Sequence, residues 1–143
     1  AVAFVDGLVT AFGGDGTTSV AVDGTELDVS VAGSDLGLLV GPRGRTLLAV
    51  QDLTRVAAQR RLGDQTTRLR VDVGGYRERR SAALASFAAS VAEQVRESGV
   101  ARALEPMASA DRKVVHDALN EAEGVTSRSE GDDPNRYIVV SPA

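Results

Sequence analysis

The sequence has 143 residues, of which 43% are hydrophobic and 25% are charged; this is the composition of a globular chain and excludes disorder as the starting interpretation. Cysteine is absent, which excludes disulfides, thiolate zinc sites and thiol nucleophiles. The net charge of -4 argues against a polyanionic partner for the chain as a whole.

Charge is unevenly distributed along the chain. Residues 1–35 hold six acidic side chains and no Lys or Arg, residues 36–80 hold ten Arg against four acids, and residues 81–143 hold six basic against ten acidic side chains. The middle third is therefore a basic island in an acidic protein. Such an island is typical of a phosphate-binding surface, but a solvated helix face has the same composition, so charge leaves both interpretations open.

The first 74 residues predict one small α+β unit. Asp23-Gly24 separates two β-branched runs and favours a two-residue hairpin, because both turn residues tolerate positive φ. Apolar residues at helical spacing follow later, at Leu47, Val50, Leu53 and Ala57. In chain order we expect a helix over 1–12, strands over 17–22 and 26–31, a short helix over 35–40, a helix from 47 to about 61 and a strand over 67–73.

The rest of the chain predicts a long helix and a second α+β unit. Apolar residues recur at three- and four-residue steps over 77–98, at Leu84, Phe87, Ala88, Val91 and Val95, and Gly99 follows as a C-terminal cap. Ser109 is a good N-cap for a helix to about Asn120. Strands are expected over 100–104, 125–129 and 137–140. We therefore expect three parts: residues 1–74, a connecting helix over 75–99, and a second domain over 100–143.

Two glycines with two residues between them lie between two predicted helices of the first unit, in Gly41-Pro42-Arg43-Gly44. Glycines at both ends let the main chain approach a sugar-phosphate backbone closely, and the following helix offers N–H groups at its N-terminus. Arg43 and Arg45 add positive charge at that point. Taken alone, the same glycine pair also marks an ordinary tight turn.

The surroundings of this glycine pair favour the clamp. Apolar residues flank it, a predicted hairpin precedes it, and a basic helix and a strand follow. The order α-β-β-α-α-β is that of a bacterial-type (type II) KH domain, whose GxxG loop clamps about four nucleotides of a single strand. The sequence therefore predicts a KH domain over residues 1–74, with Arg45 beside its binding loop.

A second motif is the pair Arg112 and His116, which lie one turn apart on one face of the predicted helix. Both side chains are able to meet a phosphate or stack on a base. Arg128 and Arg136, on the two strands that follow, are candidates for the same surface. The plainer interpretation is a half-buried helix histidine beside a solvated arginine, and an isolated pair does not decide between the two.

Three segments taken together resemble one protein family: GLLVGPRGRTLLAVQDL, VDVGGYRERR, and LEPMASADRKVVHDAL with VTSRSEGDDPNRYIVVSP. They resemble the bacterial Jag proteins, also called SpoIIIJ-associated proteins or KhpB. The resemblance runs from about Asp28 to Pro142. Such proteins join a KH domain to an "R-three-H" domain, which is named for an Arg and a His separated by three residues and binds single-stranded nucleic acid.

The resemblance implies the fold, the partners and the role of the two motifs. It implies an α+β chain in which a type II KH domain is joined by a long helix to a small R-three-H domain. It implies binding of single-stranded RNA, or of single-stranded DNA, by the 41–44 loop and by Arg112 and His116. A stand-alone KH protein is an implied partner, and control of cell elongation and division as an RNA chaperone or post-transcriptional regulator is an implied role. Many members begin with a further Jag domain, which we do not expect here.

Several absences bound the function. The sequence has no GxxxxGK[ST] loop, no GxSxG elbow and no metal-spaced histidines, so we expect no catalysis, no cofactor and no metal. No apolar run reaches about 18 residues and no signal peptide is apparent, which predicts a cytoplasmic protein without membrane insertion.

Two further expectations concern binding strength and the main alternative. Because only 3% of the residues are aromatic, little base stacking is available, and we expect weak, salt-sensitive binding of low specificity. The acidic residues should lie away from the 41–44 loop, on segments 1–35 and 121–133. A protein-interaction scaffold without functional RNA binding remains the alternative, since a scaffold needs neither Arg43 nor an exposed clamp.

Overall fold

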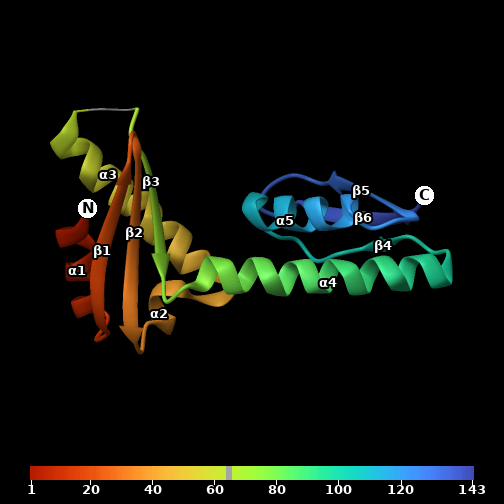
Figure 1. The fold of residues 1–143 in the computed structure, drawn as a ribbon, viewed down its shortest axis with the longest axis horizontal. Helices are drawn as coiled ribbons and strands as arrows, with labels where there is room; N and C mark the ends of the chain where they lie inside the picture. The colour runs from red at the N-terminus through yellow and green to blue at the C-terminus, as the bar shows by residue number, and fades with distance from the viewer. Residues whose placement is uncertain (64–65) are drawn as a thin grey trace. The chain divides into compact units, whose positions relative to one another are not determined.

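The computed structural model describes residues 1–63 and 66–143. The chain forms two compact units, Ala1–Arg77 and Glu78–Ala143, and their boundary falls in the first turn of helix α4 (Figure 1). Within the described residues, no helix combines the length and the apolar content that crossing a bilayer requires.

The first unit has the predicted order of elements. These are α1 (Val2–Ala11), β1 (Asp15–Asp23), β2 (Glu26–Ser34), α2 (Gly37–Val40), the 3-10 turn η1 (Pro42–Gly44), α3 (Arg45–Leu62) and β3 (Arg68–Val73). The strands form one sheet in the order β1-β2-β3, with β1 antiparallel and β3 parallel to the central strand. The α+β class is confirmed, and this order is consistent with the predicted type II KH fold.

One face of this sheet is covered by helices and the other is open. Strand residues alternate, so Leu69, Val71 and Val73 are buried while Arg70 and Asp28 are exposed. The core joins this buried face to α1, α2 and α3, through Val5, Val9, Leu39, Leu47 and Val50. The helices thereby fix the ends of α2 and α3, between which the glycine pair lies.

Two local predictions for the first unit are wrong. The hairpin turn lies at Gly24-Thr25 because Asp23 pairs with Glu26, and Gly24 takes the positive φ of +57° that the first turn position needs. In α3, Leu53 is 55% exposed, whereas Thr54 is fully buried. The Thr54 hydroxyl donates to the Val50 carbonyl at 2.6 Å, which lets a polar residue take the core position.

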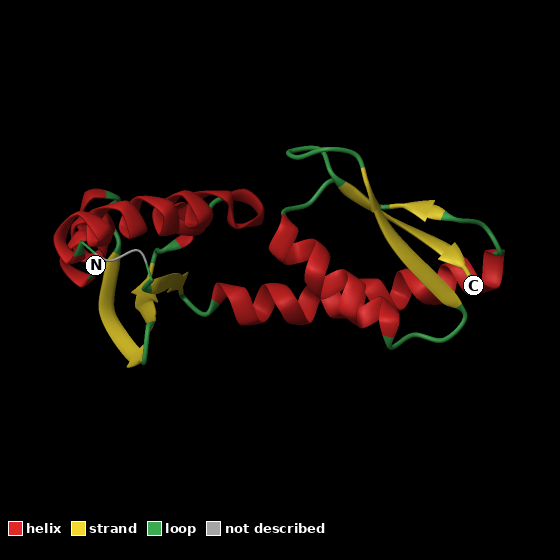
Figure 2. Ribbon diagram, turned by 90° about the horizontal axis from the view of Figure 1, so that it is seen from above, coloured by secondary structure: helices red, strands yellow, loops and turns green. Residues whose placement is uncertain are grey.

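The second unit consists of two helices and a small antiparallel sheet (Figure 2). Its elements are α4 (Tyr76–Ser98), β4 (Arg102–Ala103), α5 (Ser109–Asn120), β5 (Val125–Glu130) and β6 (Tyr137–Pro142), with the strands in the order β4-β6-β5. Residues from both helices and the sheet form its core, among them Leu84, Ala88, Val91, Val115 and Ile138. Helix α4 thus contributes Leu84, Ala88, Val91 and Val95 to this core, and these members of its apolar stripe are buried within the unit.

Three details of the second unit differ from expectation. Ser109 is the first helical residue of α5; Ala108 holds the N-cap position and no side chain caps it. The predicted strand over 100–104 is reduced to β4. Phe87 of α4 is 42% exposed, whereas Ala92, which the apolar stripe did not include, is buried. The expected division into 1–74, 75–99 and 100–143 stays a prediction.

Candidate nucleic-acid interface

The clamp loop, residues 41–44, has a backbone shape that glycine makes possible. Gly41 has φ 69° and ψ 179°, a conformation essentially restricted to glycine, and Gly44 has φ 72°. A Cβ on Gly41 would collide with Thr46 Oγ1, and one on Gly44 would lie 2.7 Å from the Tyr76 ring. Glycine is therefore required at both positions, because there is no room for a side chain and because φ is positive.

The same loop presents charge to solvent. Pro42, Arg43 and Arg45 are exposed, and Arg43 itself has a positive φ of 55°. The N-terminal, positive dipole end of α3 begins at Arg45. Leu38 of α2, which precedes the loop, is 66% exposed. The loop and the residue before it thus combine exposed cations, a backbone that a ligand can approach closely, and an apolar side chain. The first two suit a sugar-phosphate chain, and the third suits a base.

Arg112 of α5 is in a different situation, since it is only 8% exposed. Its Nε donates to the Met107 carbonyl at 3.2 Å, Nη1 donates to Ser129 Oγ at 3.5 Å, and Nη2 lies 3.4 Å from Asp133 Oδ1. Asp133, from the acidic segment 121–133, therefore lies against this arginine. Arg112 holds β5 and the loop that follows it to the start of α5.

His116 belongs to the same network. Its Nδ1 is 2.8 Å from Ser127 Oγ and its Nε2 is 2.9 Å from Ser129 Oγ. Burial lowers the pKa of His116, the Arg112 guanidinium lowers it further, and Asp117 opposes both. Both effects favour the neutral imidazole, which here acts by hydrogen bonding. Ser127 and Ser129 were missed from the sequence, although residues two apart on a strand share a face.

The structure does not bring all the predicted cations of this unit together. Ser127 and Ser129 face α5, so Arg128 between them faces the other way; it is exposed and its Nε lies 2.5 Å from Glu130 Oε1. Arg136 donates from Nη1 to the Gly131 carbonyl at 3.3 Å. Arg112 and His116 thus form one network through Ser129, which Arg128 does not join.

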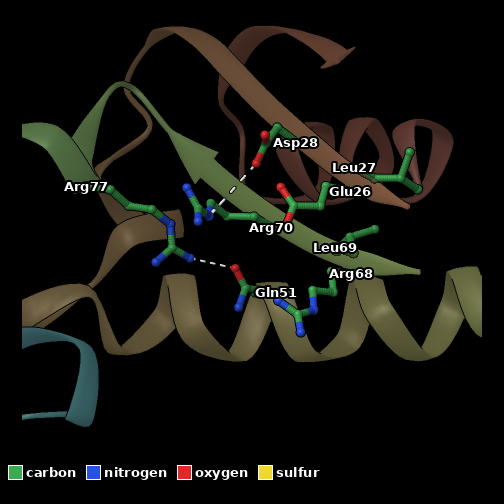
Figure 3. Close-up of a pocket in the computed structure, with 8 residues that line it drawn as sticks. All are labelled: Glu26, Leu27, Asp28, Gln51, Arg68, Leu69, Arg70 and Arg77. Carbon is green, nitrogen blue, oxygen red and sulfur yellow. Dashed lines mark hydrogen bonds and ion pairs between the residues drawn. The ribbon is translucent and has the colours of Figure 1, made fainter. Parts of the chain in front are cut away.

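A polar hollow beside β3 was also missed from the sequence. It measures about 200 Å³ and contains arginines, Gln51 and two carboxylates (Figure 3). Its lining residues are Glu26, Leu27, Asp28, Gln51, Arg68, Leu69, Arg70 and Arg77. We call it the β3 hollow. The basic residues around Arg77 predict a positively charged surface, but they do not predict this site. Gln51 is far from Arg70 and Arg77 in the sequence, and the three come together only in the folded unit.

Comparison with known families classifies the second unit first. The R-three-H domain family model matches residues 82–142, so this part of the chain is of the R-three-H class. The chain is 34% identical over 116 residues to the RNA-binding protein KhpB of Clostridium symbiosum, covering 81% of this chain and 52% of that protein. It is 30% identical over 138 residues to KhpB of Streptococcus pneumoniae, covering 96% of this chain and 42% of that protein.

A third relative is matched over a larger share of its own length. KhpB of Bacillus subtilis is 32% identical over 140 residues, which is 96% of this chain and 67% of that protein. The chain belongs to the KhpB family, as the three sequence segments predicted. It spans about half the length of the first two relatives.

Proposed function

We propose that this chain binds single-stranded RNA through a KH domain whose contact point is the clamp loop. The observation that carries the proposal is the loop itself: Gly41 and Gly44 have no room for a side chain, while Arg43 and Arg45 are exposed. Relatives named RNA-binding proteins support the choice of RNA. Single-stranded DNA is the second candidate ligand, because the proposed loop contacts are to the phosphate chain, which RNA and DNA share.

In the proposed mechanism the two units have different tasks. Phosphates lie against the clamp loop, Arg43, Arg45 and the first turn of α3, and a base lies against the exposed Leu38. In the R-three-H domain Arg112 and His116, which share the partner Ser129, hold α5 against β5 and so support the surface that meets a second stretch of the strand. Binding is weak and falls with salt because phosphate contacts release counterions. The proposed function is binding without catalysis.

The test is fluorescence anisotropy of a labelled, mixed-sequence single-stranded RNA at two salt concentrations. Arg43→Asp should lower affinity by about tenfold or more, because it replaces a cation at the phosphate chain with an anion. The matched control is Arg60→Asp, an exposed arginine in the last turn of the same helix that follows the loop, which changes the net charge equally. Equal loss in both variants, or no binding by the wild type, would contradict the proposal.

A protein-interaction role is the second candidate, and a specific observation favours it. Leu53 and Val56 of α3 are 55% and 50% exposed and lie one turn apart. Such a pair is suited to an apolar contact with another protein, and a stand-alone KH protein is the partner that the family resemblance proposes. Leu53→Asp with Val56→Asp should abolish co-elution with that partner on size exclusion while leaving RNA affinity unchanged. Loss of RNA affinity alone would contradict it.

The cellular role is a further part of the proposal. An RNA chaperone or post-transcriptional regulator in the cytoplasm, linked to cell elongation and division, is what the family resemblance supports. A strain carrying Arg43→Asp in place of the wild-type chain should then reproduce the cell-shape defect of a deletion, whereas Arg60→Asp should not.

A further inference from the structure

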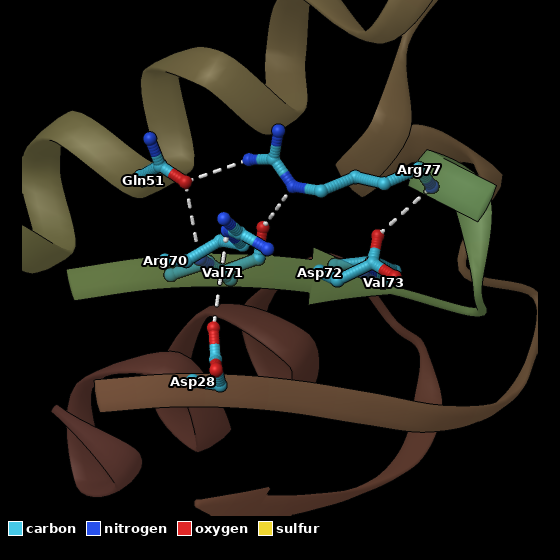
Figure 4. A network of polar contacts seen from close by, with 7 residues as sticks. All are labelled: Asp28, Gln51, Arg70, Val71, Asp72, Val73 and Arg77. Atoms are coloured by element: carbon cyan, nitrogen blue, oxygen red, sulfur yellow. Dashed lines mark hydrogen bonds and ion pairs between the residues drawn. The ribbon is translucent and has the colours of Figure 1, made fainter. Parts of the chain in front are cut away.

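The outer edge of β3 is closed by side chains of its own unit. The Val71 N–H donates to Gln51 Oε1 at 3.1 Å, and the Val71 carbonyl accepts from Arg77 Nε at 3.0 Å (Figure 4). Arg77 Nη2 also donates to Gln51 Oε1, at 2.6 Å. Because an edge strand otherwise exposes such groups to pairing, Gln51 and Arg77 block strand addition at Val71.

These contacts also fix the orientation of Arg77. Three acceptors hold the residue: Val71 and Gln51 bind its side chain, and Asp72 Oδ1 accepts its backbone N–H at 3.3 Å. Since Nε and Nη2 are engaged, Nη1 points away from these two acceptors. Because the guanidinium is already held in one orientation, its outer edge can bind a ligand without further loss of side-chain freedom. Such pre-organisation is a requirement for selective recognition.

The groups around the β3 hollow are of two kinds. Arg77, Arg70 and Arg68 supply hydrogen-bond donors, and Figure 3 shows the Arg70 and Arg77 guanidinium groups near each other. Glu26 and Asp28 of β2 supply acceptors; Asp28 Oδ1 lies 3.9 Å from Arg70 Nε, and both side chains are more than half exposed. This loose pair is open to exchange with a ligand.

We propose that the β3 hollow is a guanine-recognition site for the RNA strand held by the clamp loop, with Arg77 as its main specificity residue. The inference rests on the proposed function and deepens it. An arginine fork matches guanine O6 and N7, and a carboxylate matches guanine N1–H and N2–H₂. A phosphate fits less well, because it would face Glu26 and Asp28.

The position of Arg77 allows one strand to reach both places. Tyr76, the preceding residue, packs its ring against Gly44 of the clamp loop. Consecutive Cα atoms are about 3.8 Å apart, so the backbone of Arg77 lies one residue from the loop's own support. We therefore expect a nucleotide next to the clamped phosphates to reach the hollow. Hydrogen-bonded recognition of one base adds selectivity that the scarce aromatics do not supply.

The test uses labelled eight-nucleotide RNAs in anisotropy titrations of the full chain. The set is oligo-U, oligo-U with one central guanine, and the same oligomer with inosine, which lacks the N2 amine, or 7-deazaguanine, which lacks N7. One guanine should tighten binding about tenfold over oligo-U, and each analogue should lose most of that gain. Arg77→Met should abolish the gain and should weaken oligo-U binding no more than the matched control Arg79→Met, which removes an exposed arginine of the same helix.

Glu26→Gln with Asp28→Asn gives an independent arm, since both side chains are exposed and their replacement leaves the core intact. This variant should bind the guanine and inosine oligomers equally. Equal affinity of the wild type for all four RNAs would overturn the inference, and so would an Arg77→Met variant that weakens oligo-U as much as the guanine oligomer, which indicates a phosphate contact. Failure of the proposed function is distinguishable, because the wild type would then not bind oligo-U.

Discussion

The clamp loop and the Arg112–His116 network use arginine in opposite ways. In the loop the backbone is constrained by two glycines, and Arg43 and Arg45 are exposed to solvent. In the network the arginine is buried and bound to three protein groups, and the histidine is engaged at both ring nitrogens. The loop arginines are therefore accessible to an anion, whereas Arg112 is enclosed by its own protein. A basic residue in a motif indicates ligand contact only when the fold leaves its side chain within reach of the ligand.

The largest expected effect tests whether the loop is as constrained as the comparison requires. Gly44→Ala should lower the free energy of unfolding by about 2–4 kcal/mol, because the new Cβ meets the Tyr76 ring at a left-handed φ. Urea unfolding followed by circular dichroism measures this. Gly37→Ala, at a neighbouring glycine with open space, is the control and should change stability by less than about 0.5 kcal/mol. Equal effects of the two changes would contradict a space-limited loop.

Arg112→Ala tests the other side of the comparison. It should lower the free energy of unfolding by about 1–3 kcal/mol, because it removes charged hydrogen bonds that join α5 to β5. Arg128→Ala should lower it by less than about 0.5 kcal/mol, since its pair with Glu130 is exposed. The same urea series measures both. If Arg128 proved as important as Arg112, the buried network would not be what stabilises this unit.

The salt dependence of RNA binding sharpens the comparison. Arg43→Ala with Arg45→Ala should reduce the slope of log affinity against log salt by about 1.4, because each phosphate contact contributes about 0.7 for a single strand. Arg112→Ala, measured at a temperature at which the variant is folded, should leave the slope unchanged, since Arg112 is held by its own protein. A reduced slope in Arg112→Ala would show that the buried arginine contacts phosphate after all.

The smallest expected effect concerns pH. Burial lowers the pKa of His116 in the folded state, so between the folded pKa and the ordinary value of about 6.5 the unfolded chain binds more protons. Stability contributed by the neutral ring is complete above about pH 6.5 and decreases as pH falls through that window. Proton NMR of the ring should show a midpoint below that of an unfolded peptide. Thermal unfolding of His116→Asn should lack this part of the pH dependence.

Local rules predicted most of the fold. Alternation placed Leu69, Val71 and Val73 on the buried face of β3, and the glycine pair located the clamp loop. The errors also have local causes. The turn lies at Gly24-Thr25 and not at Asp23-Gly24, because strand pairing extends to Asp23. Thr54 and not Leu53 is buried in the core, because the Thr54 hydroxyl donates to a carbonyl of the same helix.

The sequence by itself determined the α+β order, the position of the clamp loop and the pairing of Arg112 with His116 on one face of a helix, because these depend on residues close together in the chain. Only the tertiary structure decided that Arg112 is occupied by Asp133 and Ser129, and that Gln51 meets Val71 and Arg77 at the edge of β3. The partners in these contacts are 17 to 26 residues apart. No local periodicity encodes such contacts; they form only when packing of the core brings the two segments together.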